Sequence, residues 1–149
     1  MPKRFLALHM CAAFAFIVFC TPMALAQTNS DAMQIVTMTT SMLAKELKPG
    51  SPEAHVTKVA LSEGYALALW QSGHVGGEKV FQKKFGIGWV PLGGGGGEIT
   101  RASGLASYGV PSAMATALIA GMNHCLSPQK LTFHGRQTSV CFVGPCKVC

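Results

Sequence analysis

The chain has 149 residues, of which 49% are hydrophobic and 12% are charged, and its 12 Lys and Arg against 6 Asp and Glu give a net charge of +6. This length fits one small domain with a real core rather than several domains. Basic residues are scattered apart from Lys79, Lys83 and Lys84, and no nucleic-acid-binding module is recognisable, so nucleic acid is excluded as a partner.

Residues 1–26 have the three parts of a secretory signal peptide in the right order. Lys3 and Arg4 form the positive start, residues 5–19 are apolar apart from one His, and Ala24-Leu25-Ala26 ends in the small residues that a signal peptidase accepts. We therefore expect cleavage after Ala26 and a periplasmic or secreted protein of 123 residues.

A membrane anchor and a lipoprotein are the two alternatives to cleavage after Ala26. A membrane anchor needs about 20 predominantly apolar residues, which is more than this segment offers. A lipoprotein is suggested by Cys20, but bulky Phe19 stands where such signals carry a small residue. The cleaved protein is therefore expected to have no stable membrane span.

The mature chain begins with the pattern of an amphipathic helix over residues 31–47. Asp31 and Gln34 resemble a weak capping box, and Ile35, Met38 and Met42 recur at spacings of three and four residues. Pro49 and Gly50 end the pattern.

Four strands are predicted next, at 55–61, 65–71, 78–84 and from Trp89-Val90 onward. The short turns between them favour antiparallel pairing, because parallel pairing needs crossovers of about a dozen residues. The strand 65–71 is apolar on both faces and is expected to be central. Pro91 places the fourth strand at an edge of the sheet.

Five glycines, Gly93 to Gly97, separate this sheet from two predicted helices, a weak one at 98–108 and a second from Pro111 to Asn123. Residues 124–149 form a tail, in which short strand-like runs at 131–134 and 139–143 are interrupted by Gly and Pro. The predicted fold class is α+β: an N-terminal helix, a four-stranded antiparallel meander, two C-terminal helices and a Cys-containing tail. Residues 27–123 form the single small domain.

The tail holds the candidate metal ligands. These are His124, Cys125, His134, Cys141, Cys146 and Cys149. Thiolate and imidazole groups suit copper(I) and zinc. Structural disulfides are the favoured interpretation of the four cysteines, because exported cysteines oxidise, and three connectivities are open. The mature methionines fall at helical spacing among Ile and Leu, which favours a place in the core.

No catalytic constellation is recognisable. Asp31 is the only Asp, and no G-x-S-x-G motif is present. The glycine run lacks the Lys of a phosphate-binding loop, since Glu98 follows it, and is expected to be a flexible connection or a close backbone crossing. Cys146 and Cys149 form a C-x-x-C, but they close the chain and lack the helix that follows a redox motif.

Several short motifs resemble those of one protein family. They are the strand Gly64–Trp70, then Gly76-Gly77-Glu78, Gly88-Trp89-Val90, the glycine run and Gly109-Val110-Pro111. Over about residues 55–122 the chain resembles the small exported bacterial copper uptake system-associated proteins. The resemblance implies an association with copper uptake. It supplies no ligand residues, and the Cys-containing tail after Met122 departs from the family pattern.

We expect an exported, non-enzymatic accessory or binding protein, with copper as the cofactor that the resemblance suggests and a copper-transport or other envelope protein as its partner. One alternative is a disulfide-stapled periplasmic interaction domain with no metal. Another is an enzyme whose pocket is not visible in the sequence. The sequence does not predict the oligomeric state.

Overall fold

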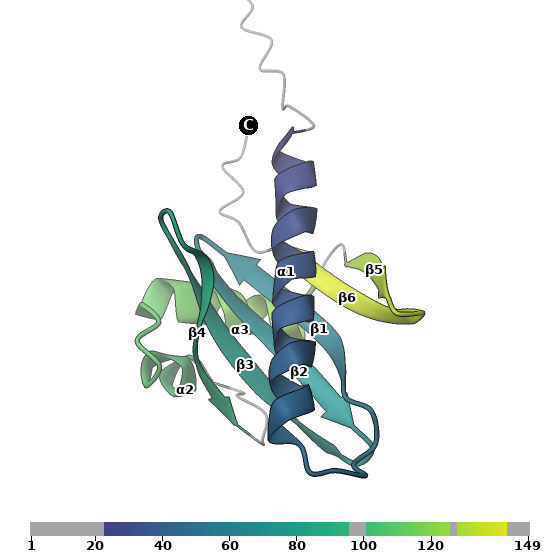
Figure 1. The fold of residues 1–149 in the computed structure, drawn as a ribbon. Coiled ribbons are helices and arrows are strands. Elements are labelled where there is room, and N and C mark those ends of the chain that lie inside the picture. The colour runs from purple at the N-terminus through teal and green to yellow at the C-terminus, as the bar shows by residue number, and fades with distance from the viewer. Residues whose placement is uncertain (1–22, 96–100, 126–127, 143–149) are drawn as a thin grey trace, which may run out of the picture.

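A six-stranded mixed sheet organises the protein, with one helix on its first face and two helices on its second (Figure 1). The computed structural model describes residues 23–95, 101–125 and 128–142. Its elements, in chain order, are α1 (Met23–Glu46), β1 (His55–Ser62), β2 (Tyr65–Ser72), β3 (Val75–Lys84), β4 (Gly88–Gly95), α2 (Ala102–Ala106), α3 (Ser112–Asn123), β5 (Gln129–Phe133) and β6 (Arg136–Phe142). None of the helices in the described ranges is long and apolar enough to cross a membrane.

The predicted four-stranded meander with two C-terminal helices is wrong. β1 to β4 do pair as consecutive antiparallel strands, but β6 pairs in parallel with β1, and β5 pairs with β6, so the strand order is β4-β3-β2-β1-β6-β5. The predicted tail therefore supplies two strands, and α2 and α3 lie between strands rather than at the end. In the predicted meander β1 would be an edge strand with unpaired backbone groups, and in the structure β6 pairs with that edge.

α1 begins earlier than the predicted helix at residue 31. The predicted signal peptide, 1–26, lies outside the described residues except for Met23–Ala26, which form the first turn of α1. Asp31 is therefore not a cap: it sits within the helix, and its carboxylate binds β3 and β4 side chains instead.

Each face of the sheet has its own hydrophobic core. The α1 face buries Ala32, Ile35, Val36, Val56, Val59, Leu61, Ala66, Ala68, Phe81, Trp89 and Val140. The face under α2 and α3 buries Ala60, Leu67, Val80, Leu105, Val110, Ala115, Leu118 and Met122. Alternate residues of β2 enter opposite cores, as expected for a central strand that is apolar on both faces.

β4 is an edge strand, as Pro91 predicted. The first three residues of the glycine run belong to it, and two of them, Gly93 and Gly94, leave no room for side chains. A Cβ atom at Gly94 would lie 2.2 Å from the backbone oxygen of Glu78, and one at Gly93 would lie 2.5 Å from the ring of Tyr108. Close approach of the backbone to β3 and to the ring of Tyr108 therefore explains the first two glycines of the run.

Candidate functional site

The predicted metal ligands do not gather into one site within the described residues. Cys125 and Cys141 form a disulfide with each other. His124 and His134 are exposed, and Cys146 and Cys149 lie outside the described residues. In the ranges that the structure describes, no group of three or more His, Cys, Asp or Glu side chains is placed to hold a metal ion.

The disulfide joins the end of α3 to the sheet. Cys125 follows the last residues of α3, and Cys141 is 1% exposed on β6, opposite Ala60 of β1. The Cα atoms of the two cysteines are 5.7 Å apart. Because both sulfurs are bonded to each other, neither is available as a thiolate ligand. The bond is compatible with an oxidising compartment.

His134 is a turn residue. Its backbone φ of 46° and the φ of 75° at Gly135 close the tight turn between β5 and β6. The imidazole ring packs edge-on against Phe133, with 4.4 Å between ring centroids. His124 caps the end of α3, where its backbone N–H donates to Ala120. Local backbone geometry accounts for both positions.

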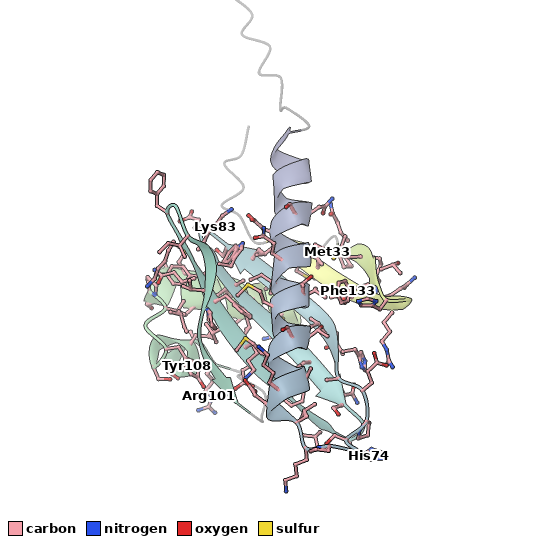
Figure 2. The ribbon with its side chains drawn as sticks, in the orientation of Figure 1. Met33, His74, Lys83, Arg101, Tyr108 and Phe133 are labelled. Carbon is pink, nitrogen blue, oxygen red and sulfur yellow. A yellow bond between two sulfur atoms is a disulfide. The ribbon has the colours of Figure 1, made fainter. Side chains whose placement is uncertain are left out.

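An open apolar groove of about 570 Å³ lies between the N-terminal half of α1 and the start of β4. Met33 and Met38 of α1 form one wall, and Ile87 and Trp89 form the other. Figure 2 shows Met33 and Lys83 at this end of the molecule and His74 at the other end. Met38 and Met42 are half-buried and pack against the core of the α1 face, as their spacing predicted, and Met33 and Met38 also line the groove.

The three clustered lysines divide between two roles. Lys79 and Lys83 lie on the α1 face of β3, where their ammonium groups bind Glu46 at 2.6 Å and Asp31 at 2.7 Å. They hold α1 against the same strand at two places, at Asp31 within the helix and at its last residue, Glu46. Lys84, one residue further, points to the opposite face and is exposed. The lysines are therefore mainly structural clamps rather than a basic patch.

Asp31 fixes the position of the β3–β4 hairpin. Its carboxylate accepts hydrogen bonds from the Lys83 ammonium and, at 3.1 Å, from Trp89 Nε1. The Lys83 ammonium also lies 5.7 Å from the centroid of the Trp89 ring, within the range of a cation–π contact. One acidic side chain therefore connects α1 to both strands of the hairpin.

Beyond this connection the hairpin carries two unpacked apolar side chains. Phe85 is 105% exposed and Ile87 is 73% exposed, while Gly86 and Gly88 adopt φ values of 73° and 93° to make the turn. Sequence analysis predicted the turn but not its exposed apolar apex. The available signal was an aromatic and an aliphatic residue inside a glycine turn, where polar residues are more usual.

A second depression, of about 330 Å³, lies at the β2–β3 turn and is lined by Thr57, Trp70, Gln71 and His74 among others. His74 is its one titratable lining residue. General acid–base chemistry needs a base placed against a nucleophile or an acid, and the lining of this depression places no such partner beside His74. Of the two hollows, the larger apolar groove beside α1 is therefore the stronger candidate for a functional site.

Asp31→Ala is expected to lower the free energy of unfolding by about 1–2 kcal/mol, because Lys83 and Trp89 lose a shared, partly buried charged acceptor. The tryptophan emission maximum should also shift to longer wavelength, because the indole N–H of Trp89 becomes exposed to water. Urea unfolding followed by fluorescence measures both effects.

The matched control is Glu53→Ala, which removes the exposed ion pair with Arg136 and should leave stability unchanged. Equal losses in the two variants would contradict the clamp role of Asp31.

Comparison of the chain with protein-family models, with curated proteins and with solved structures gives no match.

Proposed function

We propose that this chain is an exported, non-enzymatic binding domain that a disulfide holds together and that works through the surface beside α1. The observation that carries the proposal is the Cys125–Cys141 disulfide, which joins two of the candidate ligands to each other. Disulfides of this kind persist in secreted and periplasmic proteins. The disulfide thus supports the export that the N-terminal sequence predicts.

The disulfide favours the interaction domain over a thiolate metal site. A copper(I) or zinc centre built on Cys125 and Cys141 would require both to be reduced. The association with copper uptake that the resemblance implies stays a prediction, and it has to use groups other than these two sulfurs. His124, His134, Cys146 and Cys149 are the candidates that remain.

The chemistry of the groove supports binding rather than catalysis. Methionine, isoleucine and tryptophan side chains give its walls apolar contact area, and Ser30, Gln34 and Thr37 add polar groups along α1. Methionine surfaces adapt to partners of different shape. Exposed apolar patches on small domains commonly mark sites of interaction with a partner or a membrane.

The test is a count of thiols and metals on protein purified from the periplasm without added metal. We expect Cys125 and Cys141 to be recovered as one disulfide-linked peptide and copper and zinc to be well below one equivalent. Free thiols at both positions, together with about one equivalent of copper, would overturn the proposal. Mass spectrometry of the N-terminus on the same sample tests cleavage after Ala26.

A further inference from the structure

We propose that the tip of the β3–β4 hairpin, residues 84–88, docks on an anionic lipid bilayer and inserts Phe85 and Ile87 into it. The inference deepens the proposed function, because it rests on the surface beside α1 being the working surface, and it names a lipid membrane as the partner. The disulfide plays no part in it.

Exposure of the tip is the first observation. In the described residues only Val75, Phe85 and Ile87 are large apolar side chains with high exposure, and two of these three share one turn. A single exposed apolar residue is ordinary, but two at the apex of a projecting hairpin form a patch. The structure offers them no core to pack against.

The shape of the tip favours a bilayer. The hairpin projects beyond the rest of the sheet (Figure 1), so its apex can enter a soft apolar phase without a pre-formed pocket. Side chains of Phe and Ile bury their apolar area when they pass the headgroup region. The neighbouring groove walls, Met33 and Ile87 among them, continue the apolar surface from the tip toward α1.

Charge around the tip suits anionic headgroups. Lys84 immediately precedes Phe85, is exposed, and makes no ion pair with any residue of the described ranges. Its long side chain can keep the ammonium at the headgroups while its methylene groups follow the tip into the interface. Glu63, exposed on the adjacent β1–β2 turn, is the nearby acid that limits this attraction.

Flotation of the exported protein, with its N-terminus checked by mass spectrometry, tests the inference with vesicles of phosphatidylcholine alone and of an equal mixture of phosphatidylcholine and phosphatidylglycerol. Native protein should bind the mixed vesicles. Phe85→Ala should weaken binding about tenfold, since it removes most of the inserted apolar area. Lys84→Gln should weaken binding to the mixed vesicles about fivefold and leave binding to phosphatidylcholine unchanged.

Val75→Ala is the matched control, because Val75 is 59% exposed at the opposite end of β3. It should bind like native protein. A Phe85→Trp variant adds a direct readout: its emission should shift to the blue only when mixed vesicles are present. No binding by native protein, or equal binding by native protein and Phe85→Ala, would overturn the inference.

A second copy of the chain is the rival occupant, and sedimentation equilibrium without lipid identifies it. A native dimer that Phe85→Ala converts to monomer, with no flotation, would overturn membrane docking. The thiol count reports separately on the proposed function. Linked Cys125 and Cys141 with no flotation would reject only the membrane, whereas free thiols with normal flotation would reject only the disulfide-held domain.

Discussion

Phe81→Ala is expected to lower the free energy of unfolding by about 3–5 kcal/mol, the largest single effect among the substitutions considered. Phe81 is fully buried in the middle of β3, in the core that α1 covers. Its truncation removes apolar contacts with both α1 and the neighbouring strands and leaves a cavity that the sheet cannot close. Urea unfolding followed by circular dichroism measures the loss.

The same hairpin provides a control of identical chemistry. Phe85, four residues along the chain, is fully exposed, so Phe85→Ala should change stability by less than about 0.5 kcal/mol. The contrast separates a core phenylalanine from one that is available to a partner. A similar loss in both variants would mean that the tip packs against the domain, which would also remove the basis of the membrane inference.

Replacing both Cys125 and Cys141 by serine is expected to lower the free energy of unfolding by about 3 kcal/mol. The disulfide spans a sequence separation of 16 residues, and cross-linking a loop of that size restricts the unfolded chain by roughly this amount. The loss should appear as a lower midpoint in urea together with a steeper slope, because the unfolded chain without the cross-link is more expanded and exposes more surface. Measuring unfolding with and without reductant gives the same quantity on the native chain.

Reductant applied to the double serine variant is the control for this measurement. If Cys125 and Cys141 hold the stabilising bond, reductant should lower the midpoint of native protein and leave that of the variant where it was. A native protein whose midpoint does not respond to reductant would contradict a structural disulfide at this position. A variant that still responds would assign the effect to Cys146 and Cys149.

Local sequence patterns predicted the elements of the first half of the protein well. Alternation and turn residues predicted the strands at 55–61, 65–71 and 78–84, which match β1, β2 and β3 with short extensions. Apolar residues on both faces of 65–71 predicted its central position, and Pro91 predicted an edge strand. These features depend on neighbouring residues and on the chemistry of single side chains, so they are readable without the fold.

The strand-like runs predicted at 131–134 and 139–143 overlap β5 and β6, but their place in the sheet was missed because their pairing is non-local. The two strands are joined by a tight turn at Gly135, and β6 is stabilised by parallel pairing with β1, where Val59 lies opposite Val140. No pattern within residues 128–142 indicates that partner. The crossover through α2 and α3, which turns a meander into a mixed sheet, is equally invisible locally.

The sequence by itself determined the helices and strands of the first half, the even cysteine count and the expectation of export. Only the tertiary structure decided which cysteine joins Cys125, which face each lysine of β3 occupies, and that Phe85 and Ile87 stay uncovered. The physical reason is that pairing, burial and exposure depend on residues distant in the chain. Asp31 illustrates this: it resembled a helix cap, but Lys83 and Trp89, which lie more than 50 residues later, give it its role.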